Sequence, residues 1–253
     1  MPTCPLHRNR PRARRTPARV CRLVIAAACL AAFAQAQPPD DLLPRLDDPS
    51  YAVREDALGA LLADDSIDED AIAALLRRSR TAEQRHRLIA AAKHHVLRAA
   101  READFGEGAN ASLGISHDAV NLVDPEGNKA GAVYVILTLP GFPGHAVLRS
   151  GDVITAIDDK PFAPDMSRDR FAAIIRSYEA GRRITMTVRR GEAEVRVTTT
   201  LASGKALETM YDGATVEPTF RYAELWRAAR ARLEADLPAV PVLGEAEEAG
   251  ARN

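Results

Sequence analysis

The chain has 253 residues, 46% of them apolar, with 34 Lys and Arg against 35 Asp and Glu. This composition suits one domain of ordinary size plus a smaller one, without a long low-complexity tract. Seven arginines and no acidic residue precede residue 37, so the rest of the chain carries 27 basic and 35 acidic residues, a net charge of −8. Such a surface repels nucleic acid and anionic membranes.

The first 36 residues have the pattern of a secretory signal peptide. The arginines form a basic leader, Leu23 to Phe33 is apolar, and Ala34-Gln35-Ala36 fits a small-residue cleavage site. The apolar segment is shorter than the about 20 residues of a membrane-spanning helix. We therefore expect an extracytoplasmic protein, periplasmic or secreted, with no integral membrane segment once residues 1–36 are removed.

Two alternatives remain open for this leader. A basic arm would bind nucleic acid, although the apolar run directly after the arginines disfavours that. Ala26-Ala27-Ala28-Cys29 loosely resembles a lipoprotein processing site, which would place a lipid anchor at Cys29; Leu is usual three residues before such a cysteine, however. All three cysteines lie in the leader, so a chain cut after Ala36 has neither a disulfide nor a cysteine metal site.

Residues 38–104 show helical periodicity and almost no strand signal. Leucines at 42, 43 and 46 open the region, and three apolar stripes follow at 57–62, 72–76 and 88–97. The segment 46–57, with Asp48-Pro49, Arg54 and Ala57, resembles the first helix of a HEAT-type repeat, and 81–88 resembles a poorer copy. We expect a small HEAT-like helical domain packed on the domain that follows.

Strand and turn signals are clearest from Gly131 to Leu201. The run 131–137 is β-branched, has the length of a strand, and ends before a Pro- and Gly-rich turn at 140–144. A short helical turn follows, and Gly151-Asp152-Val153-Ile154 opens another strand. Residues 158–161 have the composition of a tight turn.

The next residues change from helical to strand periodicity. Phe171, Ile174, Ile175 and Tyr178 share one helix face, which predicts a helix that begins near Asp165 or Ser167 and is ended by Gly181. Residues 184–188 and 195–197 then alternate apolar and polar side chains around the turn 190–192. This pattern predicts a β-hairpin.

The order strand, Pro-Gly turn, Gly-Asp strand, helix and hairpin resembles a bacterial PDZ domain, as in HtrA-type proteases but without the protease. We therefore expect an α+β protein: the helical domain, then a PDZ-like, partly open β-barrel with flanking helices over residues 106–202. The resemblance implies that an extended peptide pairs with a strand edge and that loop amides hold its carboxylate. It assigns the peptide-binding positions, which are Leu113, Gly114, Ile115, Arg170, Ile174 and Ser177.

Beyond the PDZ-like region, Asp124-Pro125-Glu126-Gly127-Asn128 has the composition of a turn between the first two strands. Residues 203–236 are expected to form a C-terminal extension with one helix, over Tyr222 to Leu233. Residues 237–253 are expected to be a disordered acidic tail.

The sequence carries no recognisable catalytic or metal-binding motif. The sequence has no Gly-x-Ser-x-Gly elbow, no His-Glu-x-x-His pair and no phosphate-binding loop. His86, His94 and His95 are expected on one solvated helix face, since residues eight apart on a helix do not meet. We expect no enzyme activity, no cofactor and no metal.

The sequence thus favours an exported scaffold or adaptor that binds peptides or protein C-termini by strand addition. One alternative is a non-catalytic accessory or regulatory subunit of an envelope protease. Another is a structural envelope protein whose groove is occupied by its own tail.

Overall fold

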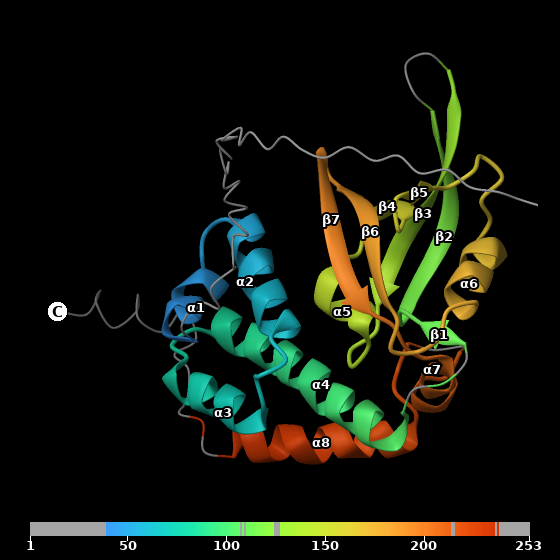
Figure 1. The fold of residues 1–253 in the computed structure, drawn as a ribbon. Coiled ribbons are helices and arrows are strands. Elements are labelled where there is room, and N and C mark those ends of the chain that lie inside the picture. Colours follow the sequence, from blue (N-terminus) through green and yellow to red (C-terminus); the bar gives the residue numbers. More distant parts are fainter. Residues whose placement is uncertain are drawn as a thin grey trace, which may run out of the picture. The chain divides into compact units, whose positions relative to one another are not determined.

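The computed structural model describes residues 39–106, 108, 110–123, 127–213, 216–235 and 237. The leader 1–36 and almost all of the tail 237–253 lie outside these residues, as does part of the turn 124–128. The described residues belong to one compact unit that begins at Ala36. It is an α+β arrangement, in which an N-terminal helical region is followed by an antiparallel sheet with flanking helices (Figure 1), as predicted.

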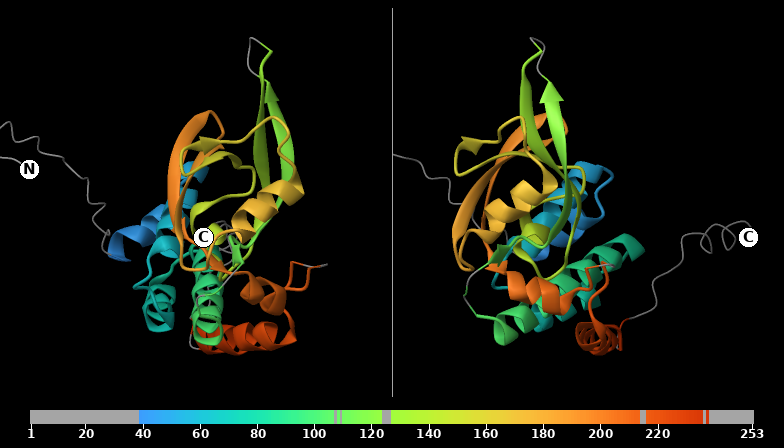
Figure 2. Two further views of the ribbon diagram at one scale, coloured as in Figure 1. Left: turned by 45° about the vertical axis from the view of Figure 1, so that its right-hand side comes forward. Right: turned by 90° about the vertical axis from the view of Figure 1, so that its right-hand side faces the viewer.

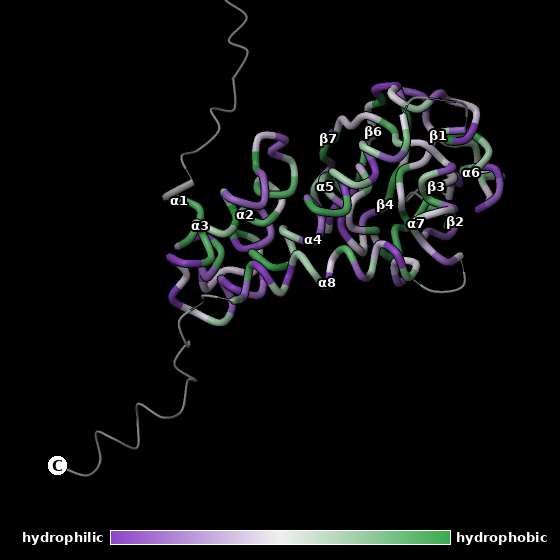
Figure 3. The backbone as a smooth tube through the Cα atoms, turned by 90° about the horizontal axis from the view of Figure 1, so that it is seen from below, coloured by the Kyte–Doolittle hydropathy of each residue, from purple (hydrophilic) through white to green (hydrophobic). Residues whose placement is uncertain are grey.

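Four helices form the N-terminal region. They are α1 (Pro39–Leu46), α2 (Tyr51–Ala63), α3 (Glu69–Arg78) and α4 (Ala82–Asp104). The Asp68 carboxylate caps α3 by accepting the N–H of Ala71 at 2.8 Å, and the Thr81 hydroxyl caps α4 by accepting that of Gln84 at 3.1 Å. Hydrophobic and hydrophilic stretches alternate along these helices (Figure 3), and their apolar faces meet in a buried leucine-rich core.

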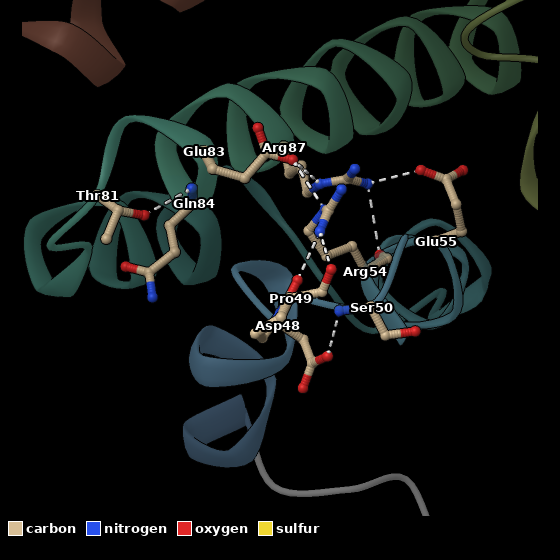
Figure 4. Close-up of polar contacts among 9 residues, drawn as sticks. All are labelled: Asp48, Pro49, Ser50, Arg54, Glu55, Thr81, Glu83, Gln84 and Arg87. Atoms are coloured by element: carbon tan, nitrogen blue, oxygen red, sulfur yellow. Dashed lines mark hydrogen bonds and ion pairs between the residues drawn. The ribbon is translucent and has the colours of Figure 1, made fainter. Parts of the chain in front are cut away.

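A charged network joins α2 to α4 (Figure 4). The Arg87 side chain, 9% exposed, donates to the carboxylates of Glu83 at 2.6 Å and Glu55 at 2.8 Å. Arg54 donates to the carbonyl oxygens of Asp48 at 2.6 Å and Pro49 at 3.1 Å. Arg87 is thus the arginine through which α4 bonds the Glu55 carboxylate of α2.

The sheet has the strand order β2-β3-β4-β6-β7, with β5 beside β4, and all its pairs are antiparallel. The strands are β2 (Ile115–Val123), β3 (Lys129–Thr138), β4 (Val153–Ile157), β5 (Lys160–Pro161), β6 (Arg183–Arg190) and β7 (Ala193–Thr200). Helix α5 (Pro143–Val147) follows β3, and α6 (Arg168–Arg176) precedes β6. The β2–β3 hairpin extends beyond the other strands (Figures 1 and 2).

The core of the sheet matches the sequence periodicity. Phe171 and Ile175 of α6 are buried, and Ile174 and Tyr178 pack against the same cluster, together with alternate residues of β3, β4 and β6. The hydroxyl of Ser167 caps α6 by accepting the N–H of Arg170 at 3.2 Å. At Gly131 a Cβ would lie 2.0 Å from the carbonyl oxygen of Ala163, so a side chain has no room there.

The C-terminal extension contains two helices, where one was expected. Strand β8 (Ala202–Ser203) pairs with β1 (Ala111–Ser112), and α7 (Gly204–Met210) and α8 (Phe220–Glu234) follow. Helix α8 lies along α4 (Figure 1), and its residues Trp226 and Leu233 pack into the helical core. The chain therefore returns to the helical region after it completes the sheet.

A third core cluster lies where the helical and sheet regions meet. It combines Leu97 of α4, Phe142 of the loop before α5, Met210 of α7 and Tyr222 of α8, all buried. Because the cluster draws on all these elements, the sheet region shares part of its core with α4, α7 and α8.

Candidate functional site

Strand β2 has a free edge, because its only partner in the described sheet is β3. Val135 of β3 turns its backbone toward β4, donating to the carbonyl of Asp152 at 2.8 Å and accepting from Gly151 at 2.9 Å. Since successive residues alternate, Tyr134 faces β2 and its partner Asp118. The N–H of the next residue, Ala119, therefore points to the free edge.

Helix α6 lies beside this edge and is joined to it by His117. The imidazole of His117 meets the ring of Phe171 edge-on, at 4.8 Å between centroids, and its Nε2 is 3.3 Å from the carbonyl oxygen of Arg168. Burial lowers the pKa of His117. His117 thus lines a groove between β2 and α6.

The loop from Leu113 to Ile115 closes one end of the groove. Gly114 has φ +67°, and a Cβ there would lie 2.1 Å from that of Phe142, so only glycine fits. The carbonyl of Leu113 accepts from Gly144 at 2.8 Å, and that of Gly114 accepts from Leu139 at 2.8 Å. The N–H of Gly114 donates to the hydroxyl of Ser112 at 3.1 Å, so this amide already has a partner.

An apolar pocket of about 130 Å³ opens at this end of the groove. Its walls come from the loop before β2, from α6 and from α7. The lining includes Leu113, Ile115, His117, Ala172, Ile175 and Leu207. Arg176 and Glu208 also line it, and both are exposed.

The predicted residues divide into two groups. Leu113, Gly114 and Ile115 line the pocket, and Ile115 is the first residue of β2. Arg170, Ile174 and Ser177 do not line it; α6 contributes Phe171, Ala172, Ile175 and Arg176 instead.

The difference on α6 has a structural cause. Arg170 is exposed and pairs with Asp165, and the Ser177 hydroxyl bonds the carbonyl of Ile174 at 2.7 Å at the helix end. The helix ends at Arg176, five residues before Gly181, which was predicted to end it. His117 was also missed as a groove residue, because only its contacts with α6 place it there.

The histidines of α4 are not solvated as a group, which corrects that prediction. His86 is exposed, but His94 and His95 are 1% and 4% exposed. Nδ1 of His94 accepts the N–H of Gly141 at 3.1 Å, its ring stacks on that of His145, and Nε2 of His95 is 2.8 Å from the carbonyl oxygen of Leu61. Burial lowers the pKa of His94 to about 2 and that of His145 to about 4.

Comparison with known proteins finds a structural similarity over part of the chain. No family model matches this chain, and no curated protein does. Among solved structures, an HtrA-type protease solved with a decapeptide is similar over part of the chain, at 22% identity and a TM-score of 0.31. The match covers 43% of this chain and 33% of that one.

The PDZ-like description of the sheet region therefore rests on its own order of strands and helices. Within the described residues, no three or more His, Cys, Asp or Glu side chains gather in a way that would hold a metal ion. No helix of the same residues has the length and apolar character needed to cross a bilayer. The β2–α6 groove is the site that this architecture presents most clearly.

Proposed function

We propose that this protein binds extended peptide segments by strand addition at the free edge of β2, acting as a non-catalytic scaffold or adaptor outside the cytoplasm. One observation carries the proposal: the unpaired edge of β2 runs beside α6 and leads to an apolar pocket at Leu113 to Ile115. The extracytoplasmic location is supported by the leader pattern of residues 1–36.

In this proposal the backbone and the side chains have separate tasks. Backbone groups of β2 such as the N–H of Ala119 would pair with the peptide, which gives affinity with little sequence preference. The pocket would then select one side chain. At about 130 Å³ it is well below the ~300 Å³ at which small-molecule sites begin, so it suits one aliphatic side chain.

A test of the backbone pairing uses the chain from residue 37 to 253. Fluorescence anisotropy would measure binding of labelled extended peptides with an aliphatic residue, each with a free and an amidated C-terminus. Ala119→Pro removes an N–H that faces away from β3, so it should weaken binding about two- to tenfold while the ladder survives. Ala119→Val keeps the N–H and should bind like the wild type.

A test of the pocket uses two neighbouring alanines of α6. Ala172 lines the pocket, whereas Ala173 is exposed and does not. Ala172→Leu should weaken peptide binding about tenfold, because the added atoms occupy the space of the ligand side chain. Ala173→Leu is the matched control. Equal binding by the two variants, or intact binding by Ala119→Pro, would refute the proposed groove.

A further inference from the structure

A second cleft lies on the other side of the sheet, between α4 and the edge strand β7, and we call it the α4–β7 cleft. It has a volume of about 590 Å³. Helix α4, the end of α2, helix α5 and the ends of β6 and β7 form its walls. The residues used below are Asp65, His94, Arg98, Arg101, Glu102 and Arg183.

Three side chains of α4 line the same wall. His94, Arg98 and Arg101 are spaced i, i+4 and i+7, which places them on one helix face. The guanidinium of Arg101 also lies over the ring of Phe142, at 5.7 Å from its centroid. Burial lowers the pKa of Arg101, so this cation is incompletely solvated where it lies.

The present partners of the two arginines are surface carboxylates. Arg98 pairs with Asp65, and Arg101 with Glu102 at 2.8 Å. The arginine side chains are 14% and 13% exposed, but Asp65 and Glu102 are 92% and 60% exposed. Ion pairs with such exposed carboxylates contribute little, so another anion can replace them at small cost.

His94 adds a donor that has no partner. Its Nδ1 accepts the N–H of Gly141, so in the neutral ring the proton is on Nε2. No hydrogen bond to Nε2 is present among the described residues, although the side chain is 99% buried and lines the cleft. Among the described residues, the fully buried side-chain atoms without a hydrogen-bond partner are Arg54 Nε and His95 Nδ1, so Nε2 of His94 is open to the cleft, where a ligand oxygen can accept its proton.

The opposite wall is also suited to an anion. Arg183, at the start of β6, is exposed and faces the same cleft, and the hydroxyls of Thr199 and Thr200 lie along β7. The lining thus carries three arginines and two acids, although the chain after the leader has a net charge of −8. The cleft is a local exception to the negative charge of the protein.

We propose that the α4–β7 cleft is an oxyanion-binding site for one carboxylate or phosphate group, held by the guanidinium groups of Arg98 and Arg101 and by Nε2–H of His94. Arginine forks match the geometry of both groups, and charge-assisted hydrogen bonds are stronger than neutral ones. The site is separate from the β2–α6 groove and does not depend on the function proposed for it.

The first experiment measures anion binding to the chain from residue 37 to 253. Calorimetric titration with inorganic phosphate and with acetate, against chloride at constant ionic strength, gives the affinity. The ¹⁵N and ¹H signals of the His94 imidazole report whether Nε2–H becomes hydrogen-bonded. Saturable binding with a shift of that signal is expected, and no saturable binding of either anion overturns the proposal.

Variants locate the site. Arg98→Gln with Arg101→Gln should weaken phosphate binding about tenfold or more, whereas Arg230→Gln, which removes an exposed arginine of α8, should not change it. Asp65→Asn should change the phosphate affinity in the opposite direction, at a residue with little influence on folding. The substitution removes the carboxylate that competes for Arg98 and should tighten phosphate binding about threefold. Unchanged affinity in Asp65→Asn and in the double variant would overturn the proposal.

The source of the anion is distinguished by a pair of peptides. One short peptide carries a single glutamate, and its twin carries glutamine at that position, both with blocked termini. Binding of the glutamate peptide with displacement of phosphate would show that an acidic side chain uses the site. If phosphate binds and the glutamate peptide does not, the site is supported and its ligand is a free anion.

Discussion

The carboxylate of Asp118 accepts the backbone N–H of the following residue, Ala119, at 2.8 Å. That N–H belongs to the free edge of β2, where an added peptide strand would place a carbonyl oxygen. The Asp118 carboxylate thus occupies the hydrogen-bond donor of Ala119 and also places a negative charge on the edge. Charged side chains on an edge strand commonly protect it against unwanted strand pairing.

Removing this carboxylate should strengthen peptide binding. Asp118→Ala leaves the N–H of Ala119 free, and one net hydrogen bond corresponds to about a two- to tenfold lower Kd. Asp118→Asn keeps an acceptor and should stay within twofold of the wild type if the hydrogen bond, and not the charge, is what competes. Fluorescence anisotropy with the same peptides measures both. Weaker binding by Asp118→Ala would show that Asp118 contacts the ligand instead of blocking the edge.

Alanine substitutions at two glycines with positive φ distinguish the cost of backbone strain from the cost of a steric clash. Gly141 has φ +85°, and a Cβ there would lie 2.7 Å from that of Leu97; Gly151 has φ +93° with nothing within 4 Å. Gly151→Ala should cost about 1 to 2 kcal/mol of unfolding free energy from strain alone. Gly141→Ala should cost about 3 kcal/mol or more, because α4 must also move. Urea denaturation compares the two, and equal losses would contradict the close packing of this loop on α4.

The buried carboxylate of Asp152 should be among the most sensitive polar positions. It is 1% exposed and accepts from the Arg190 guanidinium at 2.7 and 2.9 Å and from the N–H of Arg149 at 2.8 Å. Asp152→Ala should cost about 3 kcal/mol, since it removes the carboxylate that balances the charge of Arg190 and leaves its guanidinium with the carbonyl of Val147. Asp159→Asn, which removes the charge of an exposed pair with Arg196 and keeps a residue type that tolerates φ +60°, should cost less than about 1 kcal/mol. Thermal or urea unfolding would detect the contrast, and similar losses would argue against it.

Acid should destabilise the protein while its carboxylates are still ionised. Burial lowers the pKa of His94 to about 2 and that of His145 to about 4, against about 6.5 for an imidazole in the unfolded chain. Below pH 6.5 the unfolded state therefore binds protons that the folded state rejects. The free energy of unfolding should fall by up to about 1.4 kcal/mol per pH unit for each such histidine.

Urea unfolding at pH 7.5 and pH 5.5 checks this dependence. In His94→Asn, an amide oxygen can accept the N–H of Gly141, but the side chain does not titrate. The free energy of unfolding of this variant should therefore fall less between the two pH values than that of the wild type. The difference should correspond to the one proton that His94 binds in the unfolded chain. A wild-type protein that is equally stable at both would contradict the burial of these imidazoles.

The sequence alone was sufficient to predict the elements of the sheet region and the limits of several helices. Gly131 to Leu137, the Gly-Asp opening of β4, the face shared by Phe171 and Ile175, and the hairpin around Gly191 all carry local signals. Such signals act through side-chain alternation, glycine conformations and helix caps, each of which involves residues close in the chain.

What the sequence left open was decided by contacts between distant segments. His94 and His95 are buried because Gly141 and Leu61, at least 34 residues away, supply their partners. Long-range packing determines which face of α6 meets β2 and places α7 in the wall of the apolar pocket. The local hydrophobic periodicity of the sequence encodes neither. Periodicity shows that a helix has an apolar face, but only the tertiary structure determines which distant element covers it.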